Sequence, residues 1–156
     1  MKKGLAMRIS QVALLPLACI LAVGSLPATA AGGPTIVMAD QVKYGPAPKP
    51  YPAEAKMAVL SGDPSKAGSQ YTVRLELPSG TKIAAHTHGD EENVTVISGT
   101  LLVGVGSSFD STKMLALTAG SYVSIPAETP HYAMAKGETV VQVNGVGPAS
   151  MTYTGH

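Results

Sequence analysis

The sequence predicts an all-β domain, a sandwich or barrel built from short strands. Two observations carry this prediction. From residue 54 onward, short apolar segments are separated by Gly, Pro and polar residues, which is typical of strands joined by tight turns. After residue 30, no segment of useful length repeats its apolar residues with a helical period, so we expect no long helix.

Residues 1–30 are expected to be a cleavable export signal. The first eight residues carry three basic side chains, an apolar run spans residues 9–26, and Ala28-Thr29-Ala30 is a small-residue cleavage site. We therefore expect cleavage after Ala30 and a mature protein that is periplasmic or secreted, without a stable membrane anchor.

Two alternatives exist for this segment. It could remain as a membrane anchor, but its apolar run is short and is interrupted by Pro16. It could also carry a lipid on Cys19, but Pro16-Leu17-Ala18 is a poor lipid-attachment motif and apolar sequence continues past the cysteine.

Removal of the signal changes the composition of the chain. Cys19 is the only cysteine, so the mature protein of about 126 residues has neither disulfides nor thiol chemistry. Loss of three basic residues from 11 leaves 8 against 10 acidic residues, a net charge of −2. Without a basic patch, nucleic acid and anionic membranes are poor partners. The length fits a single domain.

Residues 31–53 are expected to form an N-terminal arm ahead of a domain that spans residues 54–156. Five prolines between residues 31 and 52 oppose both helix and sheet. Ile36–Met38 could add a short edge strand. A disordered leader after the signal is the alternative.

The strands of the domain are expected in regular succession. YTVRLEL alternates most clearly, with Tyr71, Val73, Leu75 and Leu77 on one face. The other expected strands lie in KMAVLSG, TKIAAHTH, ENVTVIS, TLLVGVG, MLALTAG, SYVSIPA, HYAMAKG, TVVQVNGV and SMTYT.

Residue types that often bind metals lie close together in TKIAAHTH and at the start of ENVTVIS. His86 and His88 are two residues apart on an expected strand, so their side chains share a face. Glu92 follows the turn-forming Gly89-Asp90 and opens the next strand, so a hairpin could bring its carboxylate over both imidazoles. With a third imidazole from His131, this set suits one divalent iron, manganese, nickel, zinc or copper ion with one or two open positions.

Some of these residues could have an ordinary structural role rather than bind a metal. A single histidine on a strand is more often a core or surface residue than a ligand, but three histidines and a glutamate in two stretches are harder to attribute to chance. Glu91 competes with Glu92 as the carboxylate, and the spacing favours Glu92. His156 is the chain terminus and is expected to play no part.

Two stretches, residues 80–99 and residues 120–131, contain these candidate ligands. They resemble the two conserved motifs of the cupin superfamily. Glu128 stands where the second motif has a glycine, and Ala135 where it has an asparagine. The matching positions are Gly80, His86, His88, Glu92 and Gly99 in the first motif, and Gly120, Pro126 and His131 in the second.

The resemblance covers residues 54–156 and includes all four positions that ligate metal in the family. It implies a single cupin barrel, also called a jelly roll or double-stranded β-helix. DEENVTVISGT and KGETVVQVNGVGP also look like small bacterial periplasmic cupins. In small cupins such N-terminal arms often cross to a neighbouring subunit, so we also expect a homodimer.

Several functions are compatible with this resemblance. The first is a metal-dependent, dioxygenase-like oxidoreductase acting on a small molecule, within which an oxalate-type decarboxylase or oxidase is a further option. The second is a module that binds a small molecule or a metal without turnover, and the third is a barrel with a vestigial site. Whether the protein is an enzyme stays open. Four side chains could add polar contacts in a pocket: Tyr122, Tyr132, Gln142 and Asn144.

Overall fold

The computed structural model describes residues 33–154, which contain eleven β-strands and two short 3₁₀ turns. The expected export signal, residues 1–30, and His156 lie outside the described residues. Within residues 33–154 there is no α-helix, and therefore no helix long and apolar enough to cross a membrane.

The strands form two sheets in which every pairing is antiparallel. The first sheet has six strands in the order β1-β2-β3-β10-β5-β8. Their bounds are Gly45–Pro46 for β1, Lys56–Ser61 for β2, Gln70–Leu77 for β3, Thr139–Val146 for β10, Glu92–Ser98 for β5 and Tyr122–Ile125 for β8.

The second sheet has five strands in the order β11-β4-β9-β6-β7. The two 3₁₀ turns, η1 and η2, lie outside both sheets. The bounds are Thr152–Tyr153 for β11, Lys82–Thr87 for β4, His131–Ala135 for β9, Thr100–Val105 for β6, Leu115–Thr118 for β7, Ala39–Gln41 for η1 and Ser111–Lys113 for η2.

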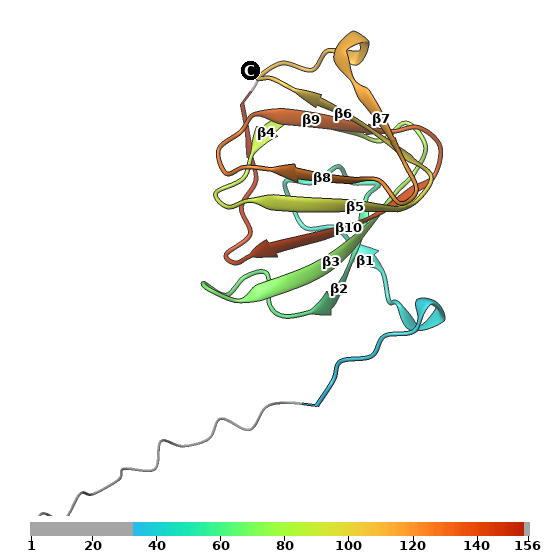
Figure 1. Cartoon of the computed structure of the whole chain (residues 1–156), viewed down its shortest axis with the longest axis vertical. Helices are drawn as coiled ribbons and strands as arrows, with labels where there is room; N and C mark the ends of the chain where they lie inside the picture. Colours follow the sequence, from blue (N-terminus) through green and yellow to red (C-terminus); the bar gives the residue numbers. More distant parts are fainter. Residues whose placement is uncertain (1–32, 155–156) are drawn as a thin grey trace, which may run out of the picture. The chain divides into compact units, whose positions relative to one another are not determined.

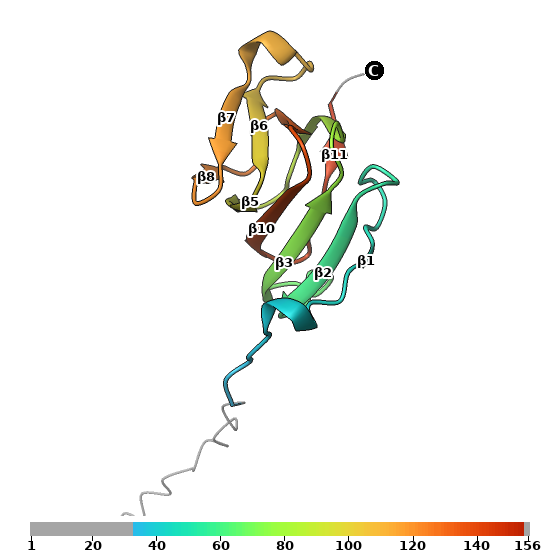
Figure 2. The same cartoon turned by 90° about the vertical axis from the view of Figure 1, so that its right-hand side faces the viewer.

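The two sheets face each other as layers of one barrel. Figure 1 shows β4, β6, β7 and β9 above β5, β8, β10 and β3, and Figure 2 shows β1, β2, β3 and β10 side by side. The core lies between the layers and draws apolar side chains from both, such as Val73 on β3, Val94 on β5 and Leu101 on β6. The predicted all-β jelly roll is therefore confirmed.

Strand alternation sets the composition of this core. On β3, the predicted inward set Tyr71, Val73, Leu75 and Leu77 is buried, while the intervening residues are partly exposed. Successive side chains on a strand point to opposite faces. Polar residues at alternate positions are therefore enough to make the outer face polar and solvent-exposed.

The N-terminal segment does not behave as the sequence suggested. Ile36–Met38 form no strand and are exposed; the strand lies later, at β1, where Gly45 pairs with Met57 of β2. The following residues stay on the same barrel, because the amide of Ala47 donates to the carbonyl of Ala55 at 3.0 Å. Prolines at alternate positions from 46 to 52 remove backbone donors, which explains why β1 is only two residues long.

Two glycines of the first motif lie in the left-handed region, for different reasons. At Gly80 (φ +84°) an added Cβ would meet nothing within 4 Å. At Gly99 (φ +76°), in the turn between β5 and β6, an added Cβ would lie 2.2 Å from the carbonyl oxygen of Glu138. Only the second position combines backbone strain with a collision against backbone.

We therefore predict unequal costs for two matched substitutions. Gly80→Ala should lower the free energy of unfolding by about 1 kcal/mol, because it forces a Cβ into the left-handed region. Gly99→Ala should cost at least about 3 kcal/mol, because the collision cannot be relieved by a side-chain rotation. Urea unfolding of the two variants measures both values, and equal losses would contradict this account of the turn.

Candidate metal centre

Two of the predicted ligands are directly paired across neighbouring strands. His86 on β4 lies opposite His131 on β9, with ring centroids 4.1 Å apart, and each residue is only 2% exposed. The register between β4 and β9 shifts between Ile83 and His86. Simple alternation would place Ile83 and His86, three residues apart, on opposite faces of β4. The irregularity lets both side chains line the interior.

His88 lies one residue beyond the end of β4 and is held from the other end of the chain. Its Nδ1 is 2.6 Å from the backbone carbonyl oxygen of Ser150. The hydroxyl of Ser150 accepts from the amide of Gly89 at 2.9 Å. This double contact fixes the turn after β4, and with it the direction of the His88 ring.

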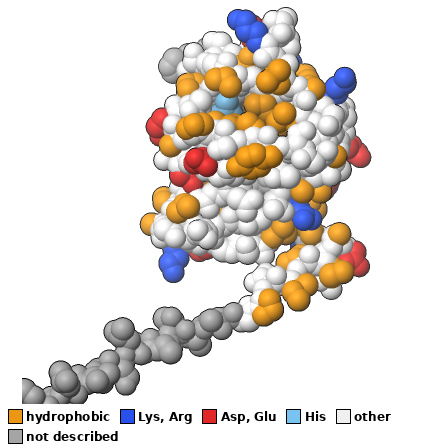
Figure 3. Space-filling view, viewed as in Figure 1, with side chains coloured by type: hydrophobic (Ala, Val, Ile, Leu, Met, Phe, Trp, Pro, Cys, Tyr) orange, Lys and Arg blue, Asp and Glu red, His pale blue; other side chains and the backbone are white. Residues whose placement is uncertain are grey.

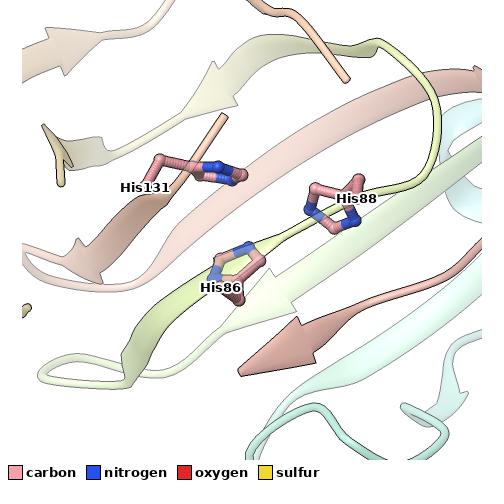
Figure 4. A group of neighbouring side chains, drawn as sticks. All are labelled: His86, His88 and His131. Carbon is pink, nitrogen blue, oxygen red and sulfur yellow. The ribbon is translucent and has the colours of Figure 1, made fainter. Parts of the chain in front are cut away.

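All three imidazoles are oriented by backbone carbonyls. Nδ1 of His86 is 2.7 Å from the carbonyl oxygen of Ala84, and Nδ1 of His131 is 2.9 Å from that of Thr129. A carbonyl only accepts hydrogen bonds, so each Nδ1 carries a proton and the neutral ring presents the lone pair of Nε2. Figure 4 shows the three rings turned toward one another, and their ligand atoms lie within 4.8 Å of one another.

Glu92 reaches this cluster from the opposite sheet. Its Oε2 lies 3.3 Å from Nε2 of His131 and 3.5 Å from Nε2 of His88. The expected hairpin is wrong: β4 and β5 belong to different sheets and do not pair. The turn between them crosses from one layer to the other, so the carboxylate meets the imidazoles across the barrel interior.

The charges of the site follow from burial and mutual contact. Burial lowers the pKa of His86 to about 4. Burial also opposes ionisation of Glu92, but contact with His131 and the field of the other imidazoles outweigh it, so the pKa of Glu92 is lowered. Burial opposes charge on His131 too, but the Glu92 carboxylate outweighs it and the pKa of His131 is raised. Glu92 is therefore an ionised carboxylate at neutral pH, which is the form that binds metal ions.

This donor set fits a divalent transition metal. Nε2 of His88 is buried and has no hydrogen-bond partner, and its 3.5 Å separation from Glu92 is too long for one. A buried ring nitrogen without a partner is costly in a folded protein. Three imidazole nitrogens with a carboxylate satisfy iron, manganese, nickel, zinc or copper, and a bound ion would give this nitrogen its missing partner.

The second motif keeps its backbone shape despite its substituted glycine. Glu128 has φ +58°, the only positive φ among the described residues that are not glycine. Its amide donates to the carbonyl oxygen of His88 at 2.9 Å, which ties the loop before β9 to the turn after β4. Glu128 is exposed, so the replacement costs backbone strain without altering the pocket wall.

Two spaces adjoin the cluster. An inner cavity of about 30 Å³ touches His86, Glu92 and His131 and is otherwise walled mainly by aliphatic side chains. An outer pocket of about 260 Å³ touches His88 and Glu92. On the face seen in Figure 3, histidine surface is exposed among apolar side chains, so the cluster is not sealed from solvent.

The four polar residues suggested as pocket contacts lie away from the cluster, which corrects that expectation. Strand alternation explains two of them: Val141 and Val143 occupy the inner face of β10, so Gln142 and Asn144 face outward. None of the four lines either space that adjoins the histidines.

Each of these four side chains has a partner elsewhere. Gln142 accepts from Nε of Arg74 at 3.3 Å, and Asn144 donates to the hydroxyl of Thr72 at 2.7 Å. The Tyr122 hydroxyl bonds to Asn93, and the buried Tyr132 donates to the carbonyl of Asp110 at 3.1 Å.

Tyr51 is a residue at the site that sequence reasoning missed. It lines both the inner cavity and the outer pocket. It lies in the proline-rich segment that was assigned to the arm, and no local pattern marks it. Only the return of this segment over the barrel brings it to the cluster.

Comparison with known proteins places these features in a family. Residues 73–146 match the family model of the Cupin domain. The chain carries a single cupin domain. This match includes both stretches that supply the predicted ligands. No curated protein sequence is detectably similar to the chain.

Solved structures with the same fold differ widely in sequence. The polyketide cyclase RemF from Streptomyces resistomycificus is 18% identical, with a TM-score of 0.62, over 76% of this chain and 83% of that one. A putative acetylacetone dioxygenase from Methylibium petroleiphilum is 20% identical, with a TM-score of 0.59, over 75% and 79%. An RmlC-like cupin from Shewanella frigidimarina is 16% identical, with a TM-score of 0.54, over 70% and 86%. At these identities the likeness establishes the fold alone.

We predict that Glu92 and Glu91, although adjacent, differ sharply in their effect on metal binding. Glu92→Gln and His131→Ala should each weaken metal affinity by more than about 100-fold, since loss of even an outer hydrogen-bond partner typically costs about 10- to 100-fold. Glu91→Gln should change little, because Glu91 is exposed and accepts from Asn93. Calorimetric titration with zinc measures all three, and equal loss from the two glutamates would refute the assignment.

We also predict that metal affinity rises with pH between about 6 and 8. A protonated imidazole cannot ligate, and the raised pKa of His131 keeps it protonated to higher pH than usual. The low pKa values of Glu92 and His86 mean that neither group adds to this dependence near neutrality. Zinc titrations in buffers across this range test the slope, and a constant affinity would contradict it.

Proposed function

We propose that this cupin is a metal-dependent enzyme acting on a small molecule, of the oxygenase type or a related oxidoreductase. The observation that supports it most directly is the buried, unpartnered Nε2 of His88 beside two further imidazoles and a carboxylate. These residues would hold an ion through four ligand atoms and would leave room for a further ligand, as catalytic metal sites do.

The chain's own residues define how the centre would work. The three backbone carbonyls hold the imidazoles in one tautomer and one direction, so little reorganisation is needed on binding. Glu92 supplies a single negative charge, so a centre holding a divalent ion would keep a net positive charge and would favour an anionic oxygen ligand. The aliphatic wall of the inner cavity limits water on that side.

A bound iron or manganese ion would supply the electron-transfer chemistry that side chains lack. His86, His88, Glu92 and His131 are the residues that would hold it. The named structural neighbours include a cyclase and a putative dioxygenase, so the fold itself is compatible with different reactions.

A binding module without turnover is the second candidate. One observation favours it: apart from the four proposed ligands, Tyr51 is the only lining residue of the inner cavity with an ionisable side chain. Enzymes of this kind usually place an acid or base beside the open position.

Export and assembly belong to this proposal as well. A periplasmic or secreted location would follow from cleavage after Ala30, and a homodimer from exposed apolar residues on the sheets, such as Val59 and Leu115. Both stay predictions.

The test of function is oxygen uptake by the metal-loaded protein. We expect consumption with iron or manganese on a panel of small enolisable carbonyl compounds and hydroxy acids. It should be lost in Glu92→Gln and retained in Glu91→Gln, since only the first changes the centre. Oxygen-electrode traces under saturating metal provide the measurement. Full metal occupancy without turnover on any compound would favour the binding module.

A further inference from the structure

The two spaces beside the cluster approach it from different sides. The inner cavity touches His86 and His131, whereas the outer pocket touches His88. Three residues line both spaces: Tyr51, Glu92 and Met151. These shared residues therefore form the boundary between the interior of the barrel and its opening.

The sizes of the two spaces differ enough to assign them different contents. About 30 Å³ accommodates roughly two molecules of the size of water. About 260 Å³ approaches the lower end of the range for pockets that hold small organic molecules, about 300–1,000 Å³. An organic ligand that reaches the cluster must therefore lie mainly in the outer pocket.

The walls of the outer pocket indicate what kind of molecule fits. Pro48, Met57 and Met151 give it an apolar surface. Lys49 is the only lysine or arginine that lines it, and Lys49 forms no ion pair with any described residue. Glu92 is its one acidic side chain, and that charge is turned toward the imidazoles. An apolar body with a negative group matches this surface.

Tyr51 is held firmly enough to act as a wall. Its amide donates to the carbonyl of Pro48 at 3.1 Å, and the hydroxyl of Tyr153 donates to the carbonyl of Pro50 at 2.8 Å. Its ring packs against the core cluster. Burial raises the pKa of the Tyr51 hydroxyl and the charge of Glu92 raises it further, so this group remains a hydrogen-bond donor.

We propose that the outer pocket is the binding site for a small organic anion, with Lys49 attracting its charge and the ring of Tyr51 keeping its body out of the inner cavity. This assignment rests on the proposed function, because it takes the four-residue cluster as the place that the ligand reaches. It goes beyond that function by giving the ligand a class, a side of approach and two recognition residues.

Benzoate, a carboxylate on an apolar ring, is a suitable probe. The mature chain is loaded with cobalt(II), and benzoate binding is followed by calorimetry and by the visible absorption of the cobalt. Lys49→Gln should weaken binding about three- to fivefold, as expected for loss of one partly exposed charge pair. Lys43→Gln is the matched control, because Lys43 is exposed in the same segment but does not line the pocket. Equal affinities in these two variants would overturn the role of Lys49.

Tyr51 is tested by a pair of substitutions. Tyr51→Ala should weaken benzoate at least about fivefold because the ring contact is lost, whereas Tyr51→Phe should stay within about twofold. Thermal unfolding of both variants shows whether the barrel is intact. If Tyr51→Phe loses as much benzoate affinity as Tyr51→Ala, the ring is not what holds the ligand. If cobalt does not bind, the proposed function fails. The same benzoate titrations on the metal-free protein then decide the pocket, since Lys49 and Tyr51 act without the metal.

Discussion

The alignment of His86 with His131 is the constraint on which the site depends. It requires the register shift in β4, because without it Ile83 or His86 would face outward. The ring centroids of His86 and His131 are 4.1 Å apart. The turn after β4 places His88 beside them, and the facing sheet supplies Glu92. The barrel thus assembles one cluster from two layers.

The second feature of the centre is that backbone, rather than other side chains, orients its imidazoles. Carbonyls of Ala84, Thr129 and Ser150 accept from the three Nδ1 atoms. Backbone positions are fixed by the sheets and their turns, so the direction of each Nε2 is set by the fold itself. Glu128 has the left-handed backbone that a glycine would adopt, and its amide keeps its contact with the carbonyl oxygen of His88.

Two segments that are far apart in the sequence complete the outer pocket. The segment from Pro48 to Tyr51 and the segment from Ala149 to Met151 both line the outer pocket. Just beyond the second segment, the hydroxyl of Tyr153 donates to the carbonyl of Pro50 in the first. Neither segment belongs to the residues 73–146 that match the family. Part of the wall of the outer pocket is therefore built by residues outside the region that matches the family.

The sequence by itself determined the all-β class, the inward set on β3 and the identity of the residues that cluster. Alternation is a local property, and the histidine and glutamate spacing matches a known family. Only the tertiary structure decided that β4 and β5 lie in different sheets, that Ser150 orients His88, and that Tyr51 reaches the cavity. These features depend on contacts between residues far apart in the chain, for which local patterns carry no signal.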